Sequence, residues 1–210
     1  MIMNQTNLNY QILLRFFKIM NDDITKLFLV SVNDSIEFQE TIDIIQDNSS
    51  CNFWLIGGFI YRSIASKLYG LKKPKVDFDF IIEKPTEKIL FPNSWRRTVN
   101  RYGNLKFIKN DGLEIDFVPL ENVHSIIRRG LSPSIENFLT GTPLNIQSIA
   151  YDVKNKIIKG DVGIKALVQQ IVAVNDFEQA KIYSARKGKL INNIIQEKAL
   201  SLGFKSILVS

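Results

Sequence analysis

The chain has 210 residues, of which 45% are hydrophobic, with 27 Lys and Arg against 21 Asp and Glu. This length and composition support a substantial buried core and argue against disorder over most of the chain. The single cysteine, Cys51, excludes an internal disulfide, and the single histidine, His124, excludes a multi-histidine metal cluster and makes a His-based triad unattractive. These features favour a cytoplasmic protein.

The first twenty residues predict a short amphipathic helix that docks on the rest of the protein, because apolar residues recur near helical spacing at Leu8, Ile12, Phe16 and Ile19. Two basic residues interrupt the apolar run and no basic region precedes it, so a secretory signal is not favoured. No run reaches the roughly 18 apolar residues that a membrane span needs, and we expect no membrane association. An acidic helix over residues 34–46 follows, and then a plausible seam at Asn48-Ser49-Ser50.

Charge changes sign close to this seam. Residues 1–50 carry a balance of −4, whereas residues 51–210 carry +10. A basic surface attracts polyanions such as RNA and nucleoside triphosphates. The basic clusters are not part of a nucleic-acid-binding motif with interleaved aromatic residues. The interpretation that they are scattered, solvated surface charges therefore has equal weight. The clusters are Arg96, Arg97 and Arg101; Arg128 and Arg129; and Arg186, Lys187 and Lys189.

A strand over residues 53–56 runs into Gly57-Gly58 and then into a helix whose buried face carries Ile60, Ile64 and Leu68. Glycines at such a turn let a phosphate approach the backbone, and the amide groups at a helix start favour an anion. Gly57 and Gly58 are therefore candidate nucleotide-binding residues, and Arg62 is a weaker one. A single Gly-Gly step is more often only a turn.

The next strand, residues 75–82, places Asp77 and Asp79 on one face and Phe78 and Phe80 on the other, because successive strand residues alternate. Two carboxylates side by side repel each other, and a cation relieves that repulsion. For either residue alone, the solvated face of a half-buried sheet is the commoner explanation.

A third aspartate follows on a predicted hairpin. After a predicted helix over residues 94–101, a strand over 105–109 turns at Asn110-Asp111-Gly112 into a strand that carries Asp116. Asp77, Asp79 and Asp116 together suit Mg²⁺, or alternatively Mn²⁺, since carboxylate and substrate phosphate oxygens complete its coordination. Two such ions activate an attacking hydroxyl and stabilise a leaving pyrophosphate, so the trio predicts a metal-dependent phosphoryl-transfer site.

The remaining elements alternate along the chain without an internal repeat. We expect helices over residues 123–129 and 135–139, a strand over 144–151, a short strand and a helix, and finally helices over 176–187 and 190–202.

The segment from about Phe53 to Gly188 resembles the head and neck of class II CCA-adding enzymes and bacterial poly(A) polymerases, within the polymerase-beta-like nucleotidyltransferase superfamily. In that family a strand runs into Gly-Gly and a helix, followed by an Asp-x-Asp strand. The matching positions here are Gly57, Gly58, Asp77 and Asp79. Weaker similarity continues through residues 142–152, 156–161 and 163–174.

The resemblance implies an α+β nucleotidyltransferase fold, with a mixed β-sheet flanked by helices and a short C-terminal helical neck. It divides the chain into an acidic helical appendage (1–50), a catalytic domain (51–160) and neck-like helices packed on it (161–210). It implies that Asp77, Asp79 and Asp116 are the catalytic and metal-binding residues, and that an NTP is the substrate.

The chain also departs from the family pattern. The family's Arg-Asp after Gly-Gly is replaced by Tyr61-Arg62-Ser63, and its Arg-Arg-Asp motif, associated with ribose recognition, would fall at Gly141-Thr142-Pro143. Gln147, or Asn145 in a shifted register, takes the place of the usual Asn. The long helical body that reads bases in the family is not expected in the last forty residues, so templated CCA addition is not expected either.

These observations favour transfer of a nucleoside monophosphate from an NTP to an acceptor hydroxyl, with an RNA 3′ end such as that of tRNA as the acceptor. Two alternatives stay open. One is a stand-alone nucleotidyltransferase that modifies a protein or a small molecule, of the toxin–antitoxin or antibiotic-modifying type, with an antitoxin-like partner. The other is a degenerate domain that binds RNA without turnover.

Overall fold

The computed structural model describes residues 21–72 and 77–209. The helix predicted for residues 1–20 lies outside them. Residues 21–32 are helical. Within the described residues, none of the helices is both long and apolar enough to cross a membrane.

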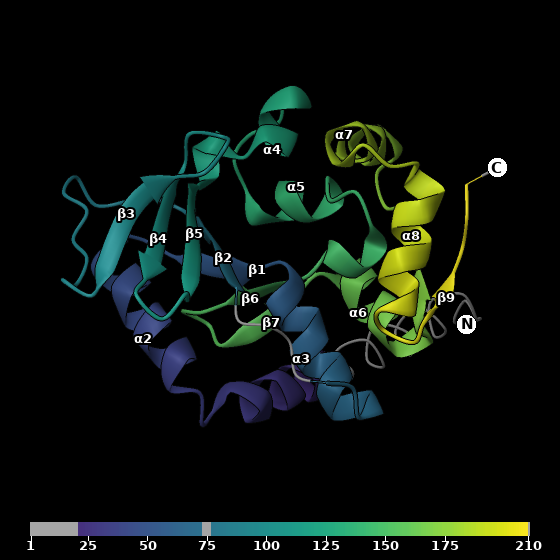
Figure 1. Cartoon of the computed structure of the whole chain (residues 1–210), viewed down its shortest axis with the longest axis horizontal. Coiled ribbons are helices and arrows are strands. Elements are labelled where there is room, and N and C mark those ends of the chain that lie inside the picture. Colours follow the sequence, from purple (N-terminus) through teal and green to yellow (C-terminus); the bar gives the residue numbers. More distant parts are fainter. Residues whose placement is uncertain (1–20, 73–76, 210) are drawn as a thin grey trace, which may run out of the picture.

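A seven-stranded mixed sheet forms the centre of the molecule (Figure 1), with the strand order β3-β4-β5-β2-β1-β6-β7. Only β2 and β5 are parallel, and every other neighbouring pair in this sheet is antiparallel. The hairpin β3–β4 lies between them in the sequence, so the chain crosses over before β5 joins β2. The strands are β1 (Phe53–Ile56), β2 (Asp77–Ile82), β3 (Trp95–Val99), β4 (Leu105–Lys109), β5 (Glu114–Pro119), β6 (Ala150–Asp152) and β7 (Ile157–Lys159).

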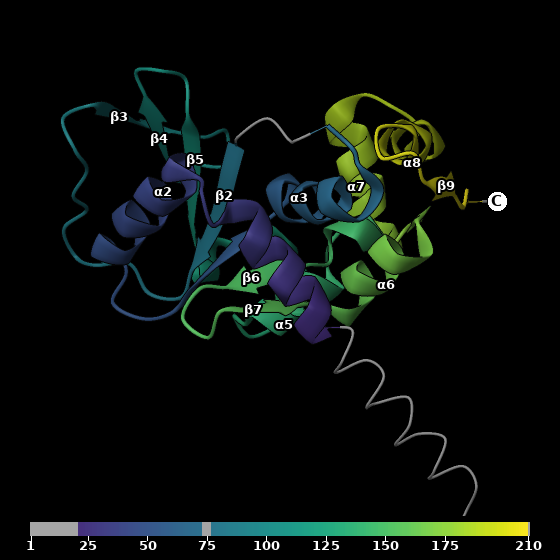
Figure 2. The ribbon, with the colours of Figure 1, turned by 90° about the horizontal axis from the view of Figure 1, so that it is seen from below.

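Helices cover both faces of the sheet. The helix of residues 21–32, α2 and α3 lie together on one face (Figure 2), and α4 and α5 cover part of the other. The C-terminal helices follow, with a two-stranded parallel sheet of β8 (Ile171–Val172) and β9 (Lys205–Ser206). The helices are α2 (Ile36–Asp47), α3 (Gly58–Tyr69), α4 (His124–Arg128), α5 (Ile135–Thr140), α6 (Asp161–Gln169), α7 (Phe177–Lys187) and α8 (Ile191–Leu200), with 3₁₀ turns at Leu120–Asn122 and Asn145–Gln147.

Alternation along β2 separates two apolar clusters. Phe78 and Phe80 are fully buried, and Phe78 packs against Phe38 of α2 and Phe59 of α3. Ile81 enters the second cluster, with residues of α4 and α5. The predicted α+β fold with a mixed sheet flanked by helices is thereby confirmed, and the second face is the one that also carries the aspartates.

The helix predicted over residues 94–101 is wrong, because this segment forms strand β3. Trp95 pairs with Lys109 across the β3–β4 hairpin, and its indole is buried. The indole N–H donates to Glu40 of α2 at 3.2 Å, and the Lys109 ammonium group lies 2.7 Å from the same carboxylate. Hairpin pairing with β4 and this anchor on α2 outweigh local helix propensity.

The strand predicted over residues 144–151 is also wrong in its first half. Residues Asn145–Gln147 form a 3₁₀ turn, and only Ala150–Asp152 join the sheet as β6. The Asn145 side chain explains the interruption, since it accepts from the backbone N–H groups of Ile146 and Ala173 and donates to Ile171 O. An Asn that binds nearby backbone groups in this way favours a turn over a strand.

Residues from all three expected segments contribute to one continuous apolar core. It contains Phe28 from the N-terminal part, Leu55 and Phe80 from the sheet, and Leu167 and Ile195 from the C-terminal part. The Asn48 side chain, at the expected seam, is fully buried. It donates to Leu90 O at 2.5 Å and accepts from Leu90 N at 2.6 Å.

Candidate functional site

Asp79 and Asp116 lie directly opposite each other on the parallel pair β2–β5. Both are partly buried and both line the same pocket. The register that pairs them also pairs Phe80 with Phe117 on the core side. The buried phenylalanines therefore fix the positions of the two carboxylates.

Asp79 is held in an environment that disfavours its charged form. Burial raises the pKa of this carboxyl, and the negative charges of Asp116 and Asp77 and a hydrogen bond with Asp116 raise it further, to about 7. The positive charge of Lys106 opposes the rise without cancelling it. A carboxyl with these neighbours is a strong candidate for a functional group, because a bound cation would remove the repulsion.

Asp77 shares the face of Asp79 but stands at the exposed start of β2, opposite Glu114 of β5. It does not line the pocket with Asp79 and Asp116. The negative charge of Asp77 nevertheless contributes to the raised pKa of Asp79. Two of the three predicted aspartates are thus neighbours in the pocket, and the third stands at its margin.

Gly57 is in close contact with the Asp79 carboxylate. It caps α3 with φ of +84°, a region that favours glycine, and a Cβ atom there would stand 2.5 Å from Asp79 Oδ2. Gly58 differs, since a Cβ there would meet only the Tyr61 hydroxyl at 3.5 Å, an ordinary contact. Gly57 lines the pocket, whereas Gly58 and Arg62 do not. Arg62 lies beside Gly58, with its Nε 3.8 Å from that same Cβ position.

Two further side chains, which were not predicted from the sequence, hold Asp116 in place. The Lys106 ammonium group lies 2.6 Å from Glu114 Oε2 and 3.7 Å from Asp116 Oδ2, and the Asn100 amide donates to Asp116 Oδ1 at 3.0 Å. Burial lowers the pKa of Lys106, but the hydrogen bond with Glu114 and the charges of Asp116, Glu114 and Asp79 outweigh it, and the pKa is raised. The predicted hairpin turn at residues 110–112 could have identified Lys106, because pairing the two strands about that turn places Lys106 opposite Asp116.

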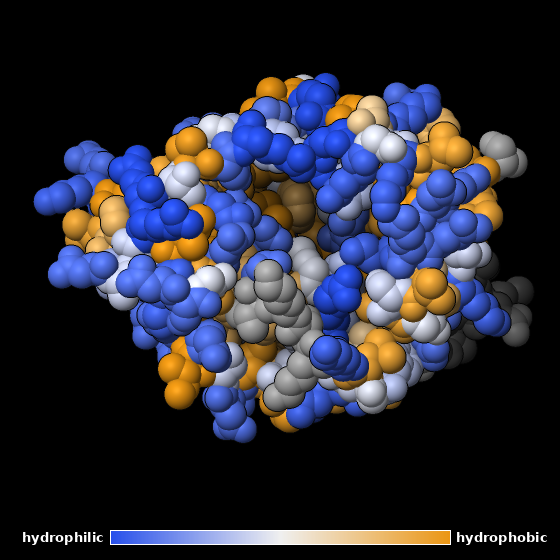
Figure 3. Space-filling model, in the orientation of Figure 1, coloured by the Kyte–Doolittle hydropathy of each residue, from blue (hydrophilic) through white to orange (hydrophobic). Residues whose placement is uncertain are grey.

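A cavity of about 900 Å³ extends from the carboxylates to the helices above the sheet. Figure 3 shows it as a hollow with apolar residues in its depth and hydrophilic residues around its rim. Asp79 and Asp116 are the only acidic residues among its described lining, whereas Lys106 and three arginines also face it. Arg101 comes from the β3–β4 turn, Arg128 from α4 and Arg186 from α7. This size suits a nucleotide-sized ligand.

The arginines come one from each of the three basic clusters of the sequence. Arg128 donates to Gln179 Oε1 of α7 at 2.6 Å, which joins two walls of the cavity. Its neighbour Arg129 fills the space next to Gly141, where a Cβ would collide with the guanidinium group. Arg129 donates there to Asn137 O and, at 3.0 Å, to Thr140 Oγ1. The segment that would carry Arg-Arg-Asp in the family thus has Arg129, the residue that follows α4, packed against it.

The donor set of the three aspartates suits Mg²⁺ or Mn²⁺, since both take carboxylate oxygens. Among the residues that the structure describes, no three His, Cys, Asp or Glu side chains are already grouped closely enough to hold a metal ion. The pocket nevertheless fits one in two respects. Burial raises the pKa of Asp79, and the neighbouring carboxylates, whose charge a cation would neutralise, raise it further. The absence of a side chain at Gly57 leaves room beside Asp79 Oδ2.

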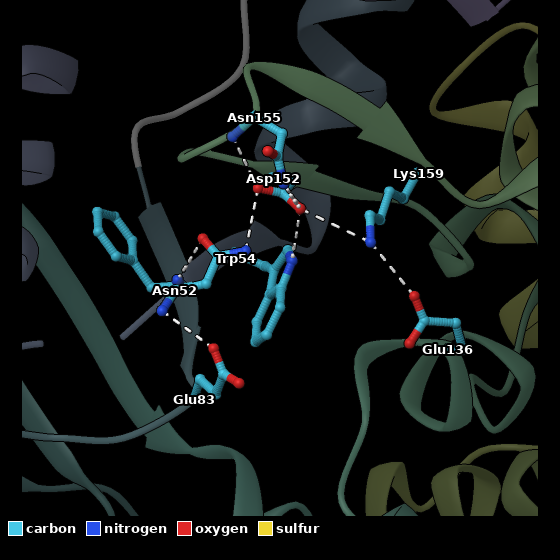
Figure 4. A network of polar contacts seen from close by, with 8 residues as sticks. Asn52, Trp54, Glu83, Glu136, Asp152, Asn155 and Lys159 are labelled. Carbon is cyan, nitrogen blue, oxygen red and sulfur yellow. Dashed lines mark hydrogen bonds and ion pairs between the residues drawn. The ribbon is translucent and has the colours of Figure 1, made fainter. Parts of the chain in front are cut away.

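A fourth aspartate of the same sheet face is held quite differently (Figure 4). Asp152 of β6 accepts from Trp54 Nε1 at 3.3 Å, from Asn52 Nδ2 at 3.1 Å and from Asn155 N at 3.0 Å. Lys159 lies 3.6 Å from it and also reaches Glu136. Burial alone would raise the pKa of Asp152, but the hydrogen bonds outweigh it and the pKa is lowered. With its oxygens occupied by protein donors, this carboxylate joins β1 to β6.

No protein-family model matches the sequence, and no curated protein matches it. Solved structures do match the fold. A CCA-adding enzyme in complex with CTP aligns at a TM-score of 0.54 and 14% identity, over 78% of this chain and 39% of that one. The Bacillus stearothermophilus CCA-adding enzyme in complex with CTP aligns at 0.54 and 19% identity, over 82% and 41%.

A CCA-adding enzyme in complex with ATP aligns at a TM-score of 0.53 and 16% identity, over 87% of this chain and 41% of that one. The chain therefore spans about two fifths of the length of these enzymes. Identities this low establish the fold and leave the activity to be argued from the site. The chain therefore shares its fold with part of these CCA-adding enzymes, as the sequence resemblance predicted.

Proposed function

We propose that this protein is a metal-dependent nucleotidyltransferase that moves a nucleoside monophosphate from an NTP to the 3′ hydroxyl of an RNA such as tRNA. The acceptor oxygen forms a bond to the α-phosphorus, the bond to the bridging oxygen breaks, and pyrophosphate leaves. One observation carries the proposal. Asp79 and Asp116 stand in register on adjacent strands, against Gly57, in the wall of a cavity of about 900 Å³.

Each part of this site has a role in the proposed reaction. Asp79 and Asp116, with Asp77 at the margin, would hold Mg²⁺ or Mn²⁺, which supplies charge neutralisation for the triphosphate and lowers the pKa of the attacking hydroxyl. The backbone at Gly57 allows the phosphates to approach the start of α3, whose free amide groups favour anions. Lys106 and Asn100 keep the Asp116 carboxylate in place.

The choice of an RNA acceptor is supported by charge and by fold. Residues 51–210 carry a balance of +10, and three arginines face the cavity. The matching structures are CCA-adding enzymes, two of them with CTP and one with ATP. A basic cavity next to paired carboxylates suits a polyanionic acceptor together with a metal-bound triphosphate.

The experiment is incubation of the full chain with each α-labelled NTP and Mg²⁺, in the presence of total RNA or of total cell protein. We expect label in RNA, and its loss in the Asp79→Asn and Asp116→Asn variants, whose folding is checked by thermal denaturation. Label in protein alone would identify the protein-modifying alternative. Equal labelling by wild type and both variants would rule out the assigned carboxylates.

A further inference from the structure

Cationic and aromatic side chains alternate along one wall of the cavity, in a series that we call the stacked row. The Arg101 guanidinium lies 5.0 Å from the ring centroid of Tyr102, and the Arg186 guanidinium lies 5.7 Å from that centroid and 4.7 Å from that of Tyr183. The Lys187 ammonium group continues the series at 5.8 Å from Tyr183. About three such contacts are expected in a chain of this size, and here four converge on two tyrosines.

The row joins two segments that are far apart in the sequence. Tyr102 belongs to the turn between β3 and β4, whereas Arg186 and Tyr183 lie on α7. Arg186 donates a hydrogen bond to the Tyr102 hydroxyl. Arg101 and Lys187 each contact a tyrosine of their own segment, and the contact of Arg186 with Tyr102 joins these two local groups into one row.

The row is also connected to the carboxylates. The Tyr102 backbone N–H donates to Asn100 Oδ1 at 2.9 Å, and the Asn100 amide donates in turn to Asp116 Oδ1 at 3.0 Å. One asparagine therefore fixes both the turn that carries Tyr102 and a proposed metal-binding carboxylate. A ligand seated on the row lies in the same cavity as Asp79 and Asp116.

The charge of the row is not neutralised by the protein. In the described part of the chain, Arg101, Arg186 and Lys187 form no ion pair with a carboxylate. Tyr102 is 37% exposed, and the ring of His124 lies 5.1 Å from it. Unpaired cations attract phosphates, and exposed ring faces stack on planar groups. A ligand that offers both alternately is a single-stranded nucleic acid.

We propose that the stacked row binds the terminal nucleotides of the single-stranded RNA acceptor. The bases pack against Tyr102 and Tyr183 together with their flanking guanidinium groups, and Arg101 and Arg186 contact the intervening phosphates. The terminal hydroxyl is thereby presented to the Asp116 side of the cavity. This inference rests on the proposed function for the identity of the acceptor, and it assigns to that acceptor a subsite separate from the metal-bound triphosphate.

The test is binding of a fluorescently labelled single-stranded RNA decamer to the full chain, measured by anisotropy without NTP. We expect Tyr102→Leu and Arg186→Gln each to weaken binding about tenfold, the scale of one lost base–aromatic stack or phosphate contact. Arg186→Gln should also lower the dependence of binding on salt by about one phosphate contact. Tyr102→Phe should bind as wild type does, because it keeps the ring face and loses only the hydroxyl that accepts from Arg186.

Two variants outside the cavity serve as matched controls. Phe177 is exposed on α7 and lies 4.5 Å from the Lys181 ammonium group, so Phe177→Leu breaks a similar contact that does not line the cavity. Arg96→Gln removes one exposed positive charge from β3. Each should change RNA affinity less than twofold.

The proposal is overturned if Tyr102→Leu and Arg186→Gln bind the decamer as their controls do. It is overturned as well if these variants lose affinity for Mg²⁺-NTP and keep affinity for RNA, since the row would then seat the base of the triphosphate. Loss of RNA affinity in Tyr102→Phe would also overturn the proposal, because it would show that the row acts through the structural hydrogen bond between Arg186 and Tyr102. RNA bound through the row by a protein that transfers no nucleotide would reject the proposed function and leave the subsite standing.

Discussion

Gly57 and Asp79 are in such close contact that no other residue fits at position 57 without displacing the carboxylate. A Cβ atom at Gly57 would stand 2.5 Å from Asp79 Oδ2, and the backbone there has φ of +84°. Gly57 directly follows β1, whose last residue, Ile56, pairs with Asp79 of β2. The diglycine turn therefore shapes the space around the carboxylate as well as the start of α3.

Gly57→Ala should reduce nucleotide transfer at least tenfold, because the methyl group displaces Asp79 and strains the backbone. Gly58→Ala is the control, since its added methyl group meets only ordinary contacts and lies in the first turn of a helix. We expect transfer within about twofold of wild type in that variant. Steady-state kinetics with labelled NTP measure both, and equal rates for the two alanine variants would refute this role of Gly57.

The raised pKa of Asp79 predicts how stability depends on pH. The folded protein binds this proton more tightly than the unfolded chain does, so the contribution of Asp79 to stability falls as pH rises from about 4 to about 7. Asp79→Asn should therefore be more stable than wild type at pH 8 without metal, by about 1 kcal/mol or roughly 2–4 °C in melting temperature. The difference should vanish near pH 4. A wild type more stable than Asp79→Asn at pH 8 would contradict it.

Mg²⁺ should raise the melting temperature of wild type, because it binds the folded carboxylates and not the unfolded chain. The rise should be larger at pH 8 than at pH 6, since the metal competes with the proton on Asp79. Differential scanning fluorimetry in Mg²⁺ and in EDTA measures the shift. Asp79→Asn provides the matched background, and a shift of the same size in that variant would place the metal elsewhere.

Lys106 is expected to set the acidic limb of the pH–rate profile. Its charge lowers the pKa of Asp79, so Lys106→Met should move that limb to higher pH. It should also lower transfer, because Asp116 loses a partner at 3.7 Å. Lys109→Met serves as the comparison, since Lys109 lies on the same strand and pairs with Glu40. If the acidic limb of the pH–rate profile is at the same pH in Lys106→Met as in wild type, the charge of Lys106 does not set it.

We expect Asp152 to contribute to the stability of the fold. Asp152→Asn replaces a buried carboxylate that accepts several hydrogen bonds, and we expect a loss of about 3 kcal/mol in the free energy of unfolding by urea. Because the pKa of Asp152 is lowered in the fold, its contribution is present above pH 4 and disappears as the carboxyl is protonated in acid. Glu136→Gln removes only the exposed partner of Lys159 and should change stability by less than about 0.5 kcal/mol.

Local sequence patterns were enough to predict much of the fold and part of the site. Alternation identified the shared face of Asp77 and Asp79, and the Asx-Gly turn identified the β4–β5 hairpin with Asp116. The parallel pairing that sets Asp79 opposite Asp116 was not readable, because it depends on a crossover rather than on neighbouring residues. The strand at residues 95–99 was mispredicted as a helix because its anchor on α2, the contact between Trp95 and Glu40, is long-range.

The contact between Tyr102 and Arg186 in the cavity wall could not be predicted from the sequence, because it joins distant segments. Tyr102 and Arg186 are 84 residues apart, and nothing in either segment indicates the other. Lys106 is the exception, because counting outward from the hairpin turn places it opposite Asp116. What the sequence hides is therefore the meeting of segments across the fold, while the chemistry within each segment can be read directly.

Asn48 has a practical consequence for handling this protein. Its buried side-chain amide joins the end of α2 to the loop before β3, and Phe28 and Phe38 of the same N-terminal part pack in the aromatic core. Expression of residues 51–210 alone would uncover those rings and leave the Leu90 amide without its acceptor. We expect such a truncated fragment to aggregate, so mutational studies of this protein should keep the first helices and use point substitutions.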